Sequence, residues 1–584
     1  MNHVLKLLAG SAAVAAALAL TAGAPLAAPP EKGAKGPSAS QGPLASAAGR
    51  ERVRSTPMPG RTEPVRKAPA EVAAFIDAEI GGRLAAEKVP ASPRCDDAEF
   101  CRRVHLDIVG RIPSAEEVIA FLDSKDPAKR AKLVDKLLDD PAYGRHMADI
   151  WYKLIVPRES DNRRLPPEPF QDWLADNFAH GRGWDRIVYE ILAADGDGAS
   201  NPQVTFYLAN ADMNRPAPNK YTATAGQLFL GIQIACAECH NHPFTKWKQT
   251  DFWGMAAFFG KVRFERGAKG AMKAGNLPGV SEIADSRGVA KGGKAAKRGG
   301  VMPAGAFIEI PESKGKMVSA RFLDGDAPDL AKAPAYRPAL ADWVAGPDNK
   351  LFAQAMVNRM WAKFFGRGFV HPVDDFHAGN PPSHPALMRG LSAEFAASGF
   401  DLKHLIRCMA ASETYQRSSR PVQGNEDDER LYSRMALKVM SPEVLYDSLA
   451  VALGAADKEP AAKGKKPQQG KGAGGSGRAA FAAFFDTADE KSDGAEYTHG
   501  IPQVLRLMND VRFNRGGAVL AKFAKSGTPA QAVEAMYLST LSRRPTEAET
   551  RRMVEFIARQ KEPREGYASA FWVLLNTSEF LLNH

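Results

Sequence analysis

The chain of 584 residues predicts a mainly α-helical, multi-domain assembly with a small β-hairpin element and low-complexity insertions. Three observations support this fold class. Apolar residues recur at helical spacing along most of the chain. Segments with the alternation of a β-strand are few and short. Stretches rich in Gly, Pro, Ala and Lys, whose composition cannot bury a core, interrupt the helical pattern.

The first 28 residues have the composition of a Sec-type signal peptide. Lys6 precedes an uncharged run of 22 residues, 7–28, that is rich in Ala and Leu and ends in small residues. We therefore expect export, with a periplasmic product after cleavage. The alternative is an uncleaved membrane anchor, because a run of this length is sufficient to span a bilayer. The following residues, 29–69, are predicted to form a disordered arm.

Low-complexity stretches divide the rest of the chain into domains. The order that we expect is a helical domain, an insertion, the first part of a partner domain, a second insertion and a C-terminal helical part, at residues 70–264, 265–300, 301–454, 455–478 and 479–584.

Helical spacing predicts the first element of the helical domain, since Phe75, Ile76, Ile80 and Leu84 recur at intervals typical of a helix. Further along, two distant segments share the pattern L-x-x-x-small-R-x-P-[ST]: residues 106–114 and 538–546. Each is followed by a Glu three residues after its final Ser or Thr, which is a capping box. The likeness predicts one helix–loop–helix used twice; convergent turn and capping chemistry is the alternative.

Strand signals are limited to two places. Residues 204–208 predict one short strand, and residues 306–310 with 317–323 predict a hairpin that turns around 312–315.

The net charge of +10 would suit a nucleic-acid-binding protein, but its distribution argues against that class. The excess of Lys and Arg lies in the low-complexity stretches: residues 261–300, for example, hold ten Lys or Arg against three Asp or Glu. Such segments are most simply solvated linkers. We therefore expect no nucleic-acid partner, and leave open a weak attraction to anionic membrane or cell-wall polymer.

The pentapeptide Cys236-Ala-Glu-Cys239-His240 is the most informative motif of the chain. It has the form C-x-x-C-H, by which a c-type haem is attached: two thiols bind the porphyrin vinyl groups and the adjacent imidazole binds the iron. Attachment of this kind takes place outside the cytoplasm, in agreement with the signal peptide. The expected cofactor is thus haem c, held by Cys236, Cys239 and His240.

A non-haem metal site is the main alternative. His242 would complete an S₂N₂ set suited to zinc or non-haem iron, although four ligands within seven residues strain a tetrahedron. Under the haem hypothesis, His242 is instead expected to orient its neighbours by a hydrogen bond. A redox or structural disulfide between Cys236 and Cys239 is the remaining alternative.

The other three cysteines carry less information. Cys95 and Cys101 flank a predicted helix start at Asp96, and are equally compatible with a local disulfide and with two unpaired thiols. Cys408 lies among apolar residues at helical spacing and is predicted to be a small buried side chain.

Two stretches resemble a known pair of domains. Residues 229–247, FLGIQIACAECHNHPFTKW, resemble the planctomycete-type cytochrome c domain of large exported bacterial proteins. Residues 358–376, NRMWAKFFGRGFVHPVDDF, and 380–385, NPPSHP, resemble the uncharacterised domain that habitually follows it. The resemblance implies haem binding by Cys236, Cys239 and His240, but the family supplies no reaction or substrate.

The second stretch contains a cluster of polar residues that could form a second site. Arg359, Asp374, Asp375 and His384 would suit acid–base chemistry or carbohydrate binding. In the structural alternative, Arg359 pairs with an aspartate, Ser383 caps a helix that begins near Pro385, and the preceding Asn-Pro-Pro forms a turn. The sequence contains no phosphate-binding loop, H-E-x-x-H or G-x-S-x-G motif.

Three functions follow from these observations. The first is an exported protein with one c-type haem that serves envelope electron transfer or redox chemistry with a redox partner. The second is a metal-dependent envelope enzyme that acts on an external polymer. The third is a non-catalytic binding protein in which the Cys/His cluster is structural.

Overall fold

The computed structural model describes residues 64–157, 165–265, 278–282, 305–313, 315–323, 327–330, 333, 335–454, 477–485, 505, 507–509 and 519–584. The predicted signal peptide and most of the predicted arm lie outside these residues. Residues 62–584 form one compact unit. The domain boundaries drawn from composition remain a prediction.

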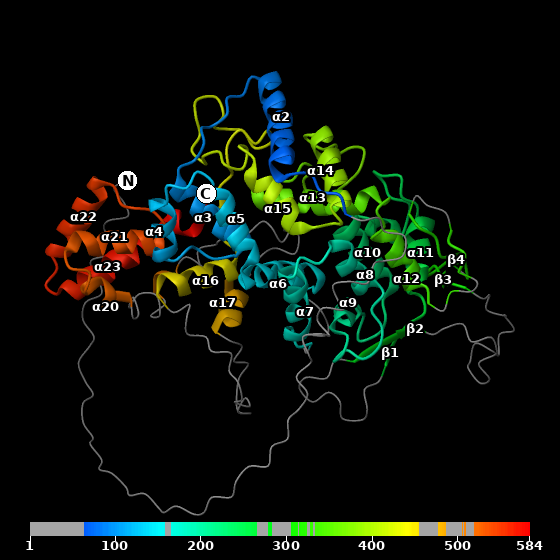
Figure 1. Cartoon of the computed structure of the whole chain (residues 1–584). Coiled ribbons are helices and arrows are strands. Elements are labelled where there is room, and N and C mark those ends of the chain that lie inside the picture. Colours follow the sequence, from blue (N-terminus) through cyan, green and yellow to red (C-terminus); the bar gives the residue numbers. More distant parts are fainter. Residues whose placement is uncertain are drawn as a thin grey trace, which may run out of the picture. The chain divides into compact units, whose positions relative to one another are not determined.

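The described residues are mainly helical, as predicted (Figure 1). The longer helices of the first half are α2 (Pro69–Glu87), α3 (Asp97–Ile108), α4 (Ala115–Asp123), α5 (Lys129–Asp139), α6 (Pro141–Ile155), α7 (Glu168–Ala179), α8 (Trp184–Leu192), α9 (Thr205–Ala209), α10 (Pro218–Leu230) and α11 (Gln249–Ala256). Short 3-10 turns are η1 (Pro202–Val204), η2 (Ala235–Glu238) and η3 (Ala257–Phe259).

The second half continues the helical architecture. Its helices are α12 (Arg337–Val344), α13 (Lys350–Phe365), α14 (Pro385–Ala397), α15 (Leu402–Ala411), α16 (Pro442–Ala452), α17 (Gly477–Phe485), α20 (Val519–Ala524), α21 (Pro529–Thr540), α22 (Glu547–Ala558), α23 (Pro563–Leu575) and α24 (Ser578–Leu581).

The strands of the described residues form three antiparallel pairs. These are β1 (Val262–Glu265) with β2 (Gly279–Glu282), β3 (Phe307–Glu309) with β4 (Met317–Ser319), and β5 (Lys438–Val439) with β6 (Leu582–Asn583). The β3–β4 pair confirms the predicted hairpin, and two positive φ angles, at Glu312 (60°) and Gly315 (95°), turn the chain between its strands. Strand β2 lies inside the stretch predicted as a low-complexity insertion.

The strand predicted at residues 204–208 is wrong. Pro202 opens the turn η1, which continues directly into α9. All the side chains of α9 are buried, and Tyr207 donates a hydrogen bond to the Leu192 carbonyl. A strand alternates between a buried and an exposed face, whereas this segment is buried all round, so its apolar run did not distinguish strand from helix.

The predicted repeat is confirmed in detail. Ser114 and Thr546 each form a capping box, with Glu117 and Glu549. Three residues before each cap, an arginine holds that same glutamate through two hydrogen bonds: Arg111 at 3.0 and 3.4 Å, Arg543 at 2.9 and 2.8 Å. The residue before each arginine, Gly110 or Ser542, has a positive φ. The same loop geometry is therefore used twice.

Two hydrophobic cores stabilise the compact unit. The first contains buried residues from Val72 to Met435, and the second contains residues from Met440 to Phe580 together with Leu106 and Ile112 of the first copy of the repeat. The second core thus includes residues from both ends of the unit.

Two buried arginines of α3 tie the final residues to this framework. Arg102 donates to the carbonyls of Thr540 and Phe580, at 3.0 and 2.7 Å. Arg103 donates to the carbonyls of His584 and Tyr415, at 3.0 and 2.6 Å. Buried carbonyl groups require donors, and each guanidinium supplies several of them.

The last residues of the predicted arm are ordered rather than disordered. The Val65 amide donates to the Ala397 carbonyl (2.9 Å), and Arg66 forms an ion pair with Asp401 (3.0 Å). Within the described residues, no helix has both the length and the apolar character that crossing a bilayer would require.

Candidate functional site

The C-x-x-C-H motif lies on the turn η2, a few residues after the end of α10. Gly231 ends α10 with a φ of 67°, and a Cβ at this position would lie 2.9 Å from the Phe376 ring. Gly231 therefore provides both the left-handed backbone and the room for Phe376, whose amide donates to its carbonyl (2.9 Å). The approach to the motif is fixed by a residue of the second half.

Contacts from α11 hold the motif itself. Trp253 Nε1–H donates to the Glu238 carbonyl (2.9 Å), and the Gln249 side-chain amide donates to the Cys239 carbonyl (2.9 Å). Ala237 is fully buried beneath the turn, whereas Cys236 and Cys239 are exposed. The two thiols are unpaired, so the structure has no disulfide between them.

The ring of His240 is exposed and has a defined tautomer. Its Nδ1 lies 2.8 Å from the carbonyl oxygen of Asn241. A carbonyl oxygen only accepts hydrogen bonds, so Nδ1 carries the proton and Nε2 carries the lone pair. This is the arrangement that metal-binding histidines usually adopt, with the distal nitrogen free to bind and the proximal one oriented by an acceptor.

His242 has the opposite arrangement. Its Nδ1 accepts from the backbone amides of Phe244 and Thr245, both at 3.2 Å, so Nδ1 carries the lone pair and Nε2 the proton. In this state neither nitrogen is available as a ligand. Across the described part of the chain, no group of three or more His, Cys, Asp or Glu side chains is arranged to hold a metal ion.

Aromatic residues surround the motif unevenly. Trp247 and Trp253 are buried in the first core, as are Phe252, Met255 and Ala256 of α11. Phe244 is 84% exposed, and its ring lies against that of His242, with ring centroids 6.5 Å apart. An exposed aromatic five residues after Cys239 in the sequence is available to cover a flat apolar group.

Two members of the second predicted cluster contact different partners. Asp374 accepts from Gln227 (2.5 Å) and Gln233 (3.2 Å), which lie in α10 and just before η2. Asp375 instead contacts His377, at 3.4 Å. Adjacent carboxylates that point to different partners do not form an acid–base pair.

The other two members of the cluster, His384 and Arg359, make further contacts. His384 Nδ1 lies 3.0 Å from Ser383 Oγ, and burial lowers the pKa of His384 to about 4. His384 is itself the N-cap residue of α14 and makes no side-chain capping bond, so the predicted Ser383 cap is wrong. The turn lies earlier than the predicted Asn-Pro-Pro, because the Asn380 amide donates to the His377 carbonyl (3.0 Å) and so closes a turn over residues 377–380. Arg359 lies over the Trp151 ring, with its guanidinium carbon 5.9 Å from the centroid.

The remaining cysteines are structural. Cys95 and Cys101 are buried and unpaired, so of the two alternatives the structure has free thiols. Cys408 is 1% exposed, as predicted. Burial raises the pKa of Cys101 and of Cys408 to about 12.

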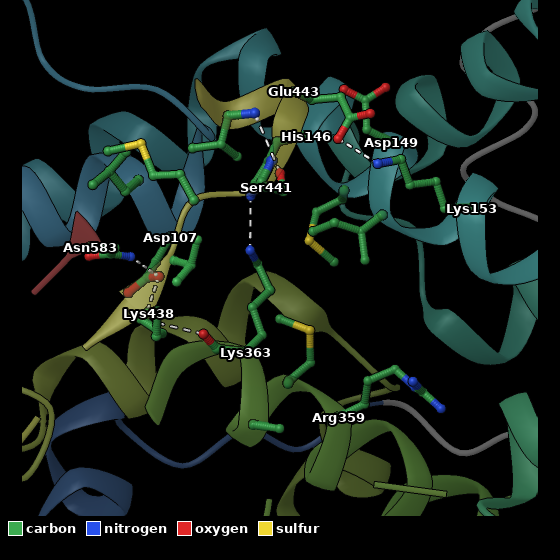
Figure 2. A pocket seen from close by; sticks show the side chains of 18 of the residues that line it. Asp107, His146, Asp149, Lys153, Arg359, Lys363, Lys438, Ser441, Glu443 and Asn583 are labelled. Atoms are coloured by element: carbon green, nitrogen blue, oxygen red, sulfur yellow. Dashed lines mark hydrogen bonds and ion pairs between the residues drawn. The ribbon is translucent and has the colours of Figure 1, made fainter. Parts of the chain in front are cut away.

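A cavity of about 380 Å³ lies away from the C-x-x-C-H turn, and Arg359 is the one residue of the second predicted cluster among those that line it (Figure 2). Its walls come from α3, α6, α13, α16 and the β5–β6 pair. Apolar side chains such as Met147, Met360 and Leu154 share these walls with charged ones. This volume falls within the range of small-molecule sites.

Most charges of the cavity are paired (Figure 2). Lys438 contacts Asp107 (2.7 Å), and Lys153 contacts Glu443 (2.6 Å). Asp149 contacts Arg478 (2.7 Å), whose guanidinium comes from α17. Each of these carboxylates thus has a cation beside it.

Lys363 differs from these cations. Its Nζ lies 2.9 Å from His146 Nε2, and within the described residues it makes no ion pair. Burial lowers the pKa of Lys363 to about 8 and holds the pKa of His146 well below its usual range. His146 is therefore neutral and accepts the hydrogen bond. A Cβ on Gly110 would lie 2.3 Å from His146 Nδ1, so Gly110 leaves room for this ring.

Sequence analysis did not find this cavity. Its residues are separated by up to several hundred positions, and periodicity gives no information on such contacts. One signal of the cavity was present in the sequence. Lys363 is a charged residue among the apolar residues Met360, Trp361 and Phe364, in a helix that is buried on most sides.

The fold and these sites define a mainly helical protein with a surface C-x-x-C-H turn in its first half and a cavity between its halves. Comparison with protein families agrees with this two-part organisation. Residues 75–264 match PSCyt2, a protein of unknown function (DUF1549), and residues 336–557 match PSD1, a protein of unknown function (DUF1553). The matches support the predicted pairing of two such domains. Comparison with curated proteins and with solved structures gives no match.

Proposed function

We propose that this protein carries one covalently attached c-type haem at Cys236, Cys239 and His240, and serves electron transfer or redox chemistry in the cell envelope. The observation that carries the proposal is the hydrogen bond from His240 Nδ1 to the Asn241 carbonyl, which leaves Nε2 ready to bind iron. Both thiols are exposed on the same turn, as thioether formation requires. When bound, the haem would supply a one-electron couple.

The residues of the chain have distinct parts in this function. Cys236 and Cys239 would anchor the porphyrin, and the Asn241 carbonyl orients the iron ligand. Gln249 and Trp253 hold the backbone of the turn, so the spacing between the thiols is fixed. Phe244, which is exposed, would be available to cover an attached group.

A zinc or non-haem iron site is less well supported by the same geometry. His242 would have to give up two backbone hydrogen bonds, and change its tautomer, before it could act as a fourth ligand. The haem needs no such change.

The test is production of the full chain in a bacterial periplasm together with haem-attachment machinery. We expect a haem-staining band on a denaturing gel and an intact mass increased by one haem. The variant Cys236→Ser/Cys239→Ser should lose both signals, and Cys408→Ala should retain them because Cys408 is buried in α15, outside the motif. A haem-free wild-type protein would contradict the proposal, and zinc or iron in that protein would favour the non-haem alternative.

A further inference from the structure

The cavity at Lys363 is independent of the C-x-x-C-H turn, since none of its lining residues lies in residues 229–247. Its walls combine α3 and α6 of the segment that matches PSCyt2 with α13, β5 and α16 of the segment that matches PSD1. Small-molecule sites occur preferentially at such junctions, where two units leave a concave surface.

One lining cation of this cavity, Lys363, has no carboxylate partner among the described residues. The lining carboxylates Asp107, Asp149 and Glu443 each contact a cation other than Lys363. Lys363 makes a single hydrogen bond within the described residues, and its partner His146 is neutral. An ammonium group has three N–H donors, so two remain for a ligand. Figure 2 shows the Lys363 side chain extending from α13 towards His146 in the middle of the cavity.

From this arrangement we propose that the cavity binds a small organic carboxylate, whose anionic group contacts the Lys363 ammonium and whose apolar body lies against the methionine and leucine walls. A carboxylate supplies both the missing charge and acceptors for the two free N–H groups. His146 fixes the position of Nζ without competing for the ligand, because the nitrogen that faces Lys363, Nε2, accepts the hydrogen bond and carries no proton. The apolar walls disfavour a fully hydrated inorganic anion.

The test measures binding to the full chain by isothermal titration calorimetry, with butanoate and its neutral isostere butanamide as probes. We expect butanoate to bind and butanamide to bind at least tenfold more weakly, because the amide lacks the charge that Lys363 requires. Lys363→Met should remove butanoate binding, and Lys363→Arg should retain part of it.

Lys403→Met is the matched control, since Lys403 is another partly buried lysine with a lowered pKa but lies outside the cavity. It should leave binding unchanged. Equal binding of butanoate and butanamide, no binding of either, or equal competition by chloride would overturn the proposal.

A second measurement keeps the test decisive if Lys363→Met does not fold. Acylation of the wild-type protein, followed by peptide mass mapping, should show that butanoate protects Lys363 and leaves Lys403 reactive. Equal acylation of Lys363 with and without butanoate would contradict the proposal. Cys236→Ser/Cys239→Ser should bind butanoate normally, so failure of haem attachment and failure of this site are distinguishable.

Discussion

Single residues in this protein show that the setting of a side chain decides its chemistry. Two histidines of the same short segment have opposite tautomers, because His240 faces a carbonyl and His242 faces two amides. The sequence singled out both residues, but it contains nothing that specifies a tautomer, since this depends on how the turn folds. Lys363 was missed for a similar reason: its isolation from carboxylates is a property of the folded cavity.

The buried, unpaired charge of Lys363 lowers the free energy of unfolding, and this effect can be measured. Burial lowers its pKa from 10.5 to about 8, so between these values the unfolded chain binds more protons than the folded one. The free energy of unfolding therefore rises with pH across this window. The groups around Lys363 are His146, Asp107 and Lys438, of which Asp107 raises its pKa and Lys438 lowers it.

We expect Lys363→Met to stabilise the carboxylate-free protein by about 1–2 kcal/mol at neutral pH, since the desolvated ammonium is removed and the lost hydrogen bond to His146 offsets part of the gain. The advantage should shrink as the pH rises from about 8 to 10.5. Urea denaturation at a series of pH values measures this. A variant that is equally destabilised at every pH would show that Lys363 stabilises the fold.

At the scale of elements, the repeated helix–loop–helix was predictable because its information is local. The pattern of a turn residue, an arginine, a proline and a cap lies within nine residues, and each position has its own physical function. The paired strands β1–β2 were not predictable, because β2 is joined to β1 through a stretch with linker composition. The helix α9 was predicted as a strand because its five buried residues carry no periodicity.

The second copy of the repeat should show a specific acid sensitivity. The hydrogen bonds from Arg543 lower the pKa of Glu549 from 4.5 to about 2. The stabilisation by Glu549 is therefore complete above pH 4.5 and is lost as the pH falls towards 2.

We expect Glu549→Gln to lower the free energy of unfolding by about 1–2 kcal/mol at neutral pH and to have little effect near pH 2, as followed by chemical denaturation. Glu547→Gln is the control in the same first turn and should change stability by less than about 0.5 kcal/mol. An equal loss in both variants would mean that helix charge, rather than the arginine contact, is responsible.

For the whole molecule, the two family segments are connected at the C-x-x-C-H turn. Asp374 and Phe376 belong to the second segment, yet they contact Gln233 and Gly231 immediately before the motif. The geometry of the first segment's motif thus depends on the second segment. The sequence indicated the pairing of the domains but not this contact, because it joins positions about 140 residues apart.

Asp374→Ala should therefore increase local opening of the segment before the turn, although Asp374 lies about 140 residues further along the sequence. Removal of the carboxylate leaves two glutamine amides without their acceptor, and we expect amide hydrogen exchange in residues 229–240 to accelerate by about tenfold or more. The adjacent substitution Asp375→Ala is the control, because Asp375 contacts His377 rather than the glutamines. Unchanged exchange in Asp374→Ala would show that the hydrogen bond from the Phe376 amide to the Gly231 carbonyl is sufficient to hold the segment in place.

Because three of the five cysteines are buried, a thiol reagent can report on the other two selectively. Burial raises the pKa values of Cys95, Cys101 and Cys408, so these three thiols are unreactive in the folded state. A thiol reagent added to the native, haem-free protein would therefore count two groups of the five cysteines, and all five after unfolding. Attachment of haem at Cys236 and Cys239 would reduce the native count to zero, so one colorimetric titration would report the fraction of the protein that carries haem.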